Sequence, residues 1–317
     1  MIEILLLFAG FILLIYGAGL LVDSASALAK SLNIPNIVIG LTIVAFGTSA
    51  PELIVNVFAA IQQSSAIALG NVAGSNIFNI LAILGISTLV YPMVVKSNTT
   101  WIEIPLALLA AIVMFVMAAD AWLDPGAPSL VSRADGIVLL LFFAIFLAYN
   151  IQLARKGDQS EELNIKSMSR TKSVLLIMAG LAMLVGGGRL IVTSATELAI
   201  SLGLSERVIA LTIISAGTSL PELATSVVAA FKKNTDIAIG NIVGSNIFNV
   251  FLILGTTAVI RPVTIAPGAG LDLTLHVLAS LLLLAFVFRG KGRRIDRAEG
   301  AVFVLLYVSY LVYLVAF

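Results

Sequence analysis

The sequence contains one long segment twice, and this repeat restricts the fold more than any other feature. Residues 39–85 align with residues 209–255 at a constant offset of 170, with 26 identities in 47 positions and no gap. Each copy carries Gly-Thr-Ser-x-Pro-Glu, starting at Gly47 and Gly217, followed 27 residues later by Gly-Ser-Asn-Ile-Phe-Asn. An interrupted polar motif in corresponding places of two hydrophobic halves is typical of a binding site between two transporter repeats.

The composition indicates a membrane protein. Sixty per cent of the residues are hydrophobic, 11% are charged, and the mean hydropathy is +1.11. Most of the chain consists of apolar runs of about 20 residues, the length that a helix needs to cross a hydrocarbon core. The first run lacks the charged n-region and cleavage site of a signal peptide, so we expect it to be the first span. We predict an all-α polytopic membrane protein.

Several functional classes are disfavoured. A net charge of +1 gives no indication of nucleic-acid binding. The chain has no cysteine and a single histidine, His276, so a disulfide, a thiolate metal site or a histidine-based metal centre is not expected. Without a catalytic nucleophile or metal centre, an intramembrane enzyme is also not expected. We therefore predict no cofactor and no enzymatic activity.

Apolar runs and turn-forming residues divide the chain into ten predicted spans. The first half contains 4–27, 36–62, 66–90, 102–119 and 135–154, and the second contains 173–200, 207–231, 237–260, 271–288 and 298–316. We expect a first repeat over 1–154, a polar linker over 155–172 and a second repeat over 173–317. Because each half has an odd number of spans, the two five-helix repeats must be inverted relative to one another.

The basic residues predict the orientation, because cytoplasmic loops of membrane proteins are enriched in Lys and Arg. With the N-terminus outside, only three basic residues lie in outer joints, namely Arg133, Arg207 and Arg261. The inner joints then contain Lys30, Lys96, Arg155, Lys156, Lys166, Arg170, Lys172, Lys232, Lys233, Arg289, Lys291, Arg293, Arg294 and Arg297. We expect an inner (cell) membrane protein with both termini outside or periplasmic and the linker in the cytoplasm.

The Gly-Thr-Ser-x-Pro-Glu motif supplies oxygen atoms that can bind cations. Pro51 and Pro221 remove a backbone donor and clash with the carbonyl four residues earlier, so we expect them to break the second and seventh spans. Non-helical backbone within a membrane is tolerated where it is buried in protein or lines a cavity. In the first copy, Thr48 and Ser49 lie within one turn of Glu52. Carboxylates, hydroxyls and freed carbonyls are the ligands that Ca²⁺ prefers and Na⁺ accepts.

The third and eighth spans add a polar stripe. Asn71, Ser75 and Asn79 recur every four residues, and Asn241, Ser245 and Asn249 repeat the pattern. Small-residue spacings on the same spans allow close helix approach, which would bring Glu52 and Glu222 together. Two neighbouring carboxylates in a low dielectric require a divalent cation, two monovalent cations or protons. Alternate occupancy of such a site by Ca²⁺ and Na⁺ is the basis of an exchange mechanism.

Each of these features alone has a purely structural explanation. A proline in a membrane helix can act only as a kink, and Ser, Thr and Asn stripes can act only in helix association. A glutamate beside the proline, repeated at one spacing in both halves, favours a binding site because an intramembrane carboxylate is costly.

The two copies resemble the α-repeats of the Ca²⁺/cation antiporter superfamily, and their motifs are similar to those of its Na⁺/Ca²⁺ exchanger branch, in its compact prokaryotic form. The resemblance implies a central cluster of four cation sites. It implies that Glu52 and Glu222 ligate Ca²⁺ with the backbone oxygens of Thr48 and Thr218. The Na⁺ sites would add Ser49, Ser75, Ser219, Ser245 and the carbonyls of Ala45 and Ser215, with Asn79 and Asn249 in the middle.

Alternatives remain open at this point. H⁺/Ca²⁺ antiport uses the same scaffold, although Thr48 and Thr218 stand where the proton-coupled branch typically has asparagine. Asn249 stands where some relatives have aspartate, which leaves the coupling ratio open. A cation channel is a weaker alternative, because a closed pair of carboxylates differs from a continuous path. We expect Ca²⁺, Na⁺ and the lipid bilayer to be the partners of a protein that functions as a monomer.

The first and sixth spans are candidates for the moving part. They lack the carboxylate motif but contain glycines, among them Gly17 and Gly19 in one and Gly180 and 186–188 in the other. Small residues leave smooth helix faces, which we expect to slide or tilt against the second, third, seventh and eighth spans.

Overall fold

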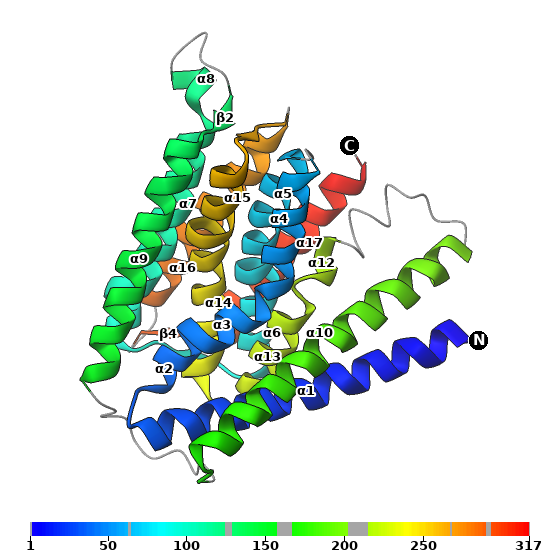
Figure 1. The fold of residues 1–317 in the computed structure, drawn as a ribbon, viewed down its shortest axis with the longest axis vertical. Coiled ribbons are helices and arrows are strands. Elements are labelled where there is room, and N and C mark those ends of the chain that lie inside the picture. Colours follow the sequence, from blue (N-terminus) through cyan, green and yellow to red (C-terminus); the bar gives the residue numbers. More distant parts are fainter. Residues whose placement is uncertain are drawn as a thin grey trace.

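The computed structural model describes residues 2–62, 65–123, 129–156, 167–201, 215–266, 268–289 and 293–316, and these are mostly helical (Figure 1). Within these ranges, eight continuous helical segments are long and apolar enough to cross a membrane. A ninth candidate consists of two helices, Asn36–Thr48 and Ala50–Ile61, that meet at a bend of 47°. The all-α polytopic membrane fold is therefore confirmed.

The elements follow the predicted spans closely. The first half contains α1 (Ile2–Leu32), α2 (Asn36–Ile39), η1 (Gly40–Val44), α3 (Ala45–Thr48), α4 (Ala50–Ile61), α5 (Ser65–Ile77), η2 (Phe78–Leu84), α6 (Gly85–Val90), β1 (Met93–Val94), η3 (Thr99–Glu103), α7 (Ile104–Ala118), α8 (Asp120–Leu123), β2 (Leu130–Val131) and α9 (Arg133–Arg155). The second contains α10 (Arg170–Ser201), α12 (Ser215–Gly217), α13 (Leu220–Phe231), α14 (Thr235–Ile247), η5 (Phe248–Leu254), α15 (Gly255–Ile260), β3 (Val263–Thr264), α16 (Ala269–Arg289), β4 (Arg294–Ile295) and α17 (Arg297–Ala316). Of the predicted span 207–231, residues 207–214 lie outside the described residues, and α12 and α13 form the rest.

The third helix of each repeat occupies the centre of the molecule. The most apolar window of Thr235–Ile260 is 94% buried and that of Ala68–Val90 is 83% buried, against 11–39% for the other six segments. The polar stripes on these two helices therefore face protein and not lipid. Because they face protein, these Asn and Ser side chains do not carry the cost of polar groups exposed to lipid.

The two halves interlock across both ends of the bundle. Strand β1 pairs with β4, and β2 pairs with β3, so each two-stranded sheet joins one half to the other. Helix α6 crosses α17 at Gly85 and Gly300, and α15 crosses α9 at Gly255 and Gly136. A Cβ on Gly85 would lie 3.0 Å from the Gly300 carbonyl oxygen, so these glycines permit close helix approach. Both crossings pack the ends of the central spans, α6 and α15, tightly against α17 and α9.

Helices α1 and α10 lie side by side and are steeply inclined to the central helices (Figure 1). Their contact is made by two glycine pairs. A Cβ on Gly10 would lie 3.0 Å from the Gly187 carbonyl oxygen, and one on Gly17 would lie 2.9 Å from that of Gly180. The closeness of both pairs indicates that α1 and α10 form one packed unit.

A candidate cation site between the two repeats

The second span bends at Ser49, two residues before Pro51. Ser49 has φ −83° and ψ 4°, well away from the α-helical ψ of about −42°. Pro51 lies in the first turn of α4, where a missing N–H costs nothing, so the bend falls two residues before the proline and not at it. The seventh span repeats this arrangement, with Ser219 at φ −91° and ψ 7° before Pro221.

The two glutamates are braced by serines of the opposite repeat. Ser49 Oγ donates to Glu222 Oε1 at 2.9 Å, and Ser219 Oγ donates to Glu52 Oε1 at 2.9 Å. Both glutamates are only 1% exposed. The two bends and the two carboxylates therefore meet at the interface between the repeats, as the sequence predicted.

The central helices add the next pair of hydroxyls. Ser245 Oγ lies 3.0 Å from Ser49 Oγ, and Ser75 Oγ lies 3.2 Å from Ser219 Oγ. Each serine of a central helix thus contacts the bend of the other repeat. A chain of oxygens runs from each carboxylate through one bend to one central helix.

Four asparagines form a second bridge between the repeats. Asn79 Nδ2 donates to Asn246 Oδ1 and Asn249 Nδ2 donates to Asn76 Oδ1, both at 2.9 Å. These bonds fix the orientation of the Asn79 and Asn249 side-chain amides, because the Nδ2 atom of each donates to an asparagine of the opposite repeat. Asn76 and Asn246 were not predicted as site residues, although their places in the repeated motif are a signal that could identify them.

The oxygens that remain form an acceptor-rich cluster. Within the described part of the chain, Oε2 of Glu52 and of Glu222 and Oδ1 of Asn79 and of Asn249 are buried without a hydrogen-bond partner. Leaving a buried acceptor unpaired costs about 1–3 kcal/mol, and more if it is charged. A bound cation satisfies such acceptors directly. Carboxylate and amide oxygens with neighbouring hydroxyls are suited to Ca²⁺ and Na⁺.

Both central helices change to π-helical geometry at this level. The segments η2 and η5 begin at Phe78 and Phe248, again 170 residues apart, and contain Asn79 and Asn249. Single π-helical turns occur frequently at functional sites. The π-helical turns could not be predicted from the sequence, because a wider helical turn produces no distinct hydrophobic period.

The predicted backbone ligands lie at corresponding places before the two bends. Ala45 begins α3 and Ser215 begins α12. The Ala45 carbonyl oxygen accepts the Ser49 N–H at 2.9 Å and lies 3.3 Å from the Thr48 hydroxyl. It stands one helical turn from the serine that holds the opposite carboxylate.

The described hydrogen bonds differ between the two halves of the cluster. Thr48 Oγ1 donates to Asn241 Oδ1 at 3.0 Å, and Asn241 Nδ2 donates to Ser226 Oγ at 2.9 Å. The equivalent Thr218 hydroxyl and Asn71 amide nitrogen are buried without a partner among the described residues. The Asn241 side chain of α14 is therefore bonded to the second span, and among the described residues no matching bond joins Asn71 to Thr218.

A glycine of α14 permits a close helix contact. A Cβ on Gly240 would lie 3.0 Å from Gly40 Cα, so α14 packs tightly against the second span. At the offset of 170, the residue that corresponds to Gly40 and would face Gly70 is residue 210, which lies outside the described residues.

The difference between the hydrogen bonds of Thr48 and Thr218 can be tested with a matched pair of variants. Thr48→Ala removes a buried hydroxyl, and Asn241 Oδ1 then loses its hydrogen-bond donor. We therefore expect the free energy of unfolding to fall by about 1–2 kcal/mol. Thr218→Ala removes a hydroxyl without a described partner and should cost less. Thermal unfolding in detergent measures both, and a larger loss for Thr218→Ala would contradict the assignment of these contacts.

A further buried carboxylate lies outside this cluster. Glu103 in η3 is fully buried and accepts a hydrogen bond from the Tyr149 hydroxyl of α9. It belongs to neither repeated motif. Glu103 therefore provides a reference carboxylate within the membrane-spanning region.

Comparison with known proteins identifies the family. The sequence profile described as "Sodium/calcium exchanger protein" matches residues 2–152 and 172–316. The chain is 37% identical to "Inner membrane protein YrbG" of Escherichia coli over 98% of this chain and 94% of that protein. It is 33% identical to "Sodium/calcium exchanger MaX1" of Methanosarcina acetivorans over 99% and 98% of the two chains.

A solved structure shares the whole fold. The structure of the sodium-calcium exchanger NCX_Mj soaked with 10 mM Na⁺ and zero Ca²⁺ superposes with a TM-score of 0.83 at 31% identity, covering 98% of each chain. The profile matches both halves separately, which confirms the two repeated halves. The chain is a multi-pass membrane transporter and not an enzyme, and it belongs to the sodium/calcium exchanger protein family.

Proposed function

We propose that this protein exchanges Na⁺ for Ca²⁺ by alternating access to the cluster between α4, α5, α13 and α14. The observation that carries the proposal is the pair of buried glutamates, each braced by a serine of the opposite repeat and each with a free carboxylate oxygen. Two carboxylates balance the charge of one Ca²⁺ or of two monovalent cations. An empty site leaves two charges uncompensated in a low dielectric, so exchange of one ion for the other is favoured over an empty return.

The proposed ligands divide by ion. Glu52 and Glu222 hold Ca²⁺ with the backbone oxygens of Thr48 and Thr218. The Na⁺ ligands are the hydroxyls and carbonyls beside them, with the free amide oxygens in the middle, namely Ser49, Ser75, Ser219, Ser245, Ala45, Ser215, Asn79 and Asn249. The names of NCX_Mj and MaX1 support both ions as cargo.

The proposed moving part is the α1–α10 pair, with a correction to the role of its glycines. Gly17, Gly180 and Gly187 do not face the central helices, because they pack α1 against α10. A leucine at position 187 would meet the Gly10 carbonyl oxygen, since even a Cβ there would lie 2.8 Å from it. Gly188 does face α13, since a Cβ on it would lie 3.8 Å from Pro221 Cδ. The pair therefore moves as one body.

We further propose that the protein is a monomer in the inner (cell) membrane, with both termini outside and the 155–172 linker in the cytoplasm. The distribution of Lys and Arg supports this orientation. The name of the Escherichia coli relative supports the membrane. The repeats are proposed to be inverted over 1–154 and 173–317.

Flux measurements test the proposed exchange. Purified protein in liposomes loaded with Na⁺, with K⁺ or with acidic buffer is diluted into ⁴⁵Ca²⁺. We expect rapid uptake only with internal Na⁺. Uptake driven equally by a proton gradient would instead support H⁺/Ca²⁺ antiport, and uptake without any counter-gradient would support a channel.

Ca²⁺ exchange should also depend on pH. Each proton bound to Glu52 or Glu222 removes one of the two negative charges that Ca²⁺ requires, so protons and Ca²⁺ compete for the site. We expect the apparent Ca²⁺ affinity to weaken as the pH falls from alkaline to mildly acidic. An affinity that stays constant over this range would contradict a paired-carboxylate site.

A further inference from the structure

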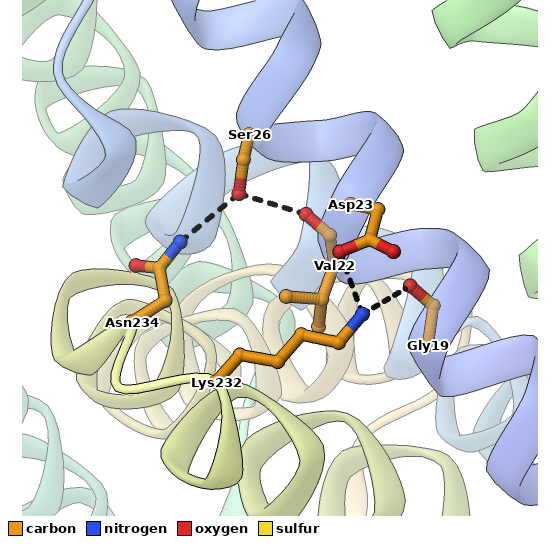
Figure 2. Close-up of polar contacts among 6 residues, drawn as sticks. All are labelled: Gly19, Val22, Asp23, Ser26, Lys232 and Asn234. Atoms are coloured by element: carbon orange, nitrogen blue, oxygen red, sulfur yellow. Dashed lines mark hydrogen bonds and ion pairs between the residues drawn. The ribbon is translucent and has the colours of Figure 1, made fainter. Parts of the chain in front are cut away.

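An ion pair joins the first helix to the turn between the seventh and eighth spans (Figure 2). Lys232 follows the last residue of α13, and its Nζ lies 2.6 Å from Asp23 Oδ1 of α1. The same Nζ donates to the Gly19 carbonyl oxygen at 3.0 Å. A Cβ on Gly19 would lie 3.9 Å from the ammonium, an ordinary van der Waals distance.

A second contact lies one turn further along α1. Asn234 Nδ2 donates to Ser26 Oγ at 3.0 Å, and Ser26 Oγ donates to the Val22 carbonyl oxygen at 2.8 Å (Figure 2). Asn234 and Ser26 are buried, at 4% and 5% exposed. The α13–α14 turn therefore holds α1 by a charged contact at the surface and a neutral one beneath it. We name the four residues Asp23, Ser26, Lys232 and Asn234 the latch.

The internal repeat shows that the charged contact exists on one side only. At the offset of 170, Asp23 corresponds to Thr193 and Lys232 corresponds to Gln62. Threonine and glutamine carry no charge, so this ion pair has no counterpart between α10 and the α4–α5 turn. The latch breaks the symmetry of the two repeats.

The packing of the two half-spans follows the same asymmetry. Helix α1 packs against α13, and Ala224 and Thr225 of α13 are buried, at 8% and 0% exposed. The equivalent residues of α4, Ile54 and Val55, are 56% and 37% exposed. These two positions are thus buried on α13, which α1 contacts, and exposed on α4.

We propose that the latch favours the state in which α1 covers α13, and that it thereby sets the balance between the two access states of the transporter. This inference rests on the proposed exchange mechanism. In an inverted-repeat transporter, the two states interconvert when the halves adopt each other's conformation. A contact that exists in only one state shifts the equilibrium by its own free energy. Asp23, Ser26, Lys232 and Asn234 are positioning residues and bind no cargo.

The latch should be modest in strength. The side chains of Lys232 and Asp23 are 35% and 57% exposed, and exposed ion pairs are weak because water and salt screen them. Loss of the pair should therefore change the ratio of the two states about two- to fivefold. A latch of this strength biases the equilibrium without trapping the transporter.

The chain contains no cysteine, so one introduced thiol reports on one position. Thr225→Cys places a thiol at a fully buried position of α13 whose equivalent on α4, Val55, is 37% exposed, and we expect a maleimide to react there when α1 moves away. We expect Lys232→Met in this background to raise the labelling rate about two- to fivefold. The double exchange Asp23→Lys with Lys232→Asp should bring the rate back toward that of the unmodified latch.

Two controls separate the latch from simpler effects. Lys233→Met removes the same charge from the adjacent residue, which lies over the Tyr91 ring at 5.9 Å, and it should leave the rate unchanged. Ala110→Cys, fully buried in α7, reports general loosening and should label equally slowly with and without Lys232→Met. Equal rates for Lys232→Met and Lys233→Met at Thr225→Cys would overturn the proposal, and so would faster labelling at both reporter positions.

The labelling assay requires no ion gradient, so its outcome is independent of the flux assay. If the wild-type protein shows no Na⁺-dependent Ca²⁺ flux, the exchange proposal fails whatever the labelling rates are. If exchange is present and Lys232→Met leaves Thr225→Cys labelling unchanged, only the latch fails.

Discussion

Glu52→Gln and Glu222→Gln are each expected to abolish Ca²⁺ exchange while the protein still folds and inserts. Either change leaves a single negative charge to balance Ca²⁺ within a site that is almost completely buried. An uncompensated charge in a buried pair costs about 3–5 kcal/mol, which corresponds to a loss of affinity of at least about 100-fold. Ca²⁺ uptake into Na⁺-loaded liposomes is the measurement.

Glu103→Gln is the matched control for this prediction. It makes the same change at another fully buried carboxylate, one that Tyr149 contacts and that lies outside the cluster. We expect exchange to persist in this variant. Near-wild-type flux in both Glu52→Gln and Glu222→Gln would remove the basis for the proposed site, and loss of flux in all three variants would indicate a general requirement for buried carboxylates.

A covalent bond between α1 and the α13–α14 turn is expected to stop exchange completely. Ser26 Oγ and Asn234 Nδ2 are 3.0 Å apart, so Ser26→Cys with Asn234→Cys places two thiols within reach of oxidative or short-reagent crosslinking. If α1 must leave α13 in each cycle, the crosslinked protein cannot turn over. Flux should return after reduction of the disulfide.

Each single-cysteine variant controls for the substitution itself, because it experiences the same oxidation without forming the bond. Full exchange in a fully crosslinked sample would show that the moving element lies elsewhere. The α9–α15 crossing at Gly136 and Gly255 is not expected to open, since the β-strand pairs and helix crossings hold these helices.

Much of the fold followed from hydrophobic run length and from the internal repeat. Predicted span boundaries such as 135–154 and 237–260 lie within two residues of α9 and of the continuous helix over Thr235–Ile260. Span length is set by bilayer thickness, which composition reveals directly. The predicted position of the bend in the second span was less accurate. Pro51 fits the first turn of α4, and Ser49 takes the irregular backbone angles.

The arrangement of the site could be predicted only in part. Two copies of one motif placed Glu52 and Glu222 at a shared interface, but the cross-bracing by Ser219 and Ser49 depends on how the repeats interlock. The Asn79–Asn246 bridge likewise joins residues 167 positions apart. Contacts of this kind depend on three-dimensional register, for which a single sequence carries no period or spacing signal.

Equilibrium binding of ⁴⁵Ca²⁺ to the purified protein, titrated with Na⁺ and with K⁺ as the matched control ion, tests most directly whether both ions share one site. We expect Na⁺ to displace Ca²⁺ with a dependence steeper than that of a single ion, and K⁺ not to displace it. We expect Glu52→Gln and Glu222→Gln to lose the bound Ca²⁺. Ca²⁺ binding that is insensitive to Na⁺, or that survives in both glutamine variants, would contradict the shared carboxylate site.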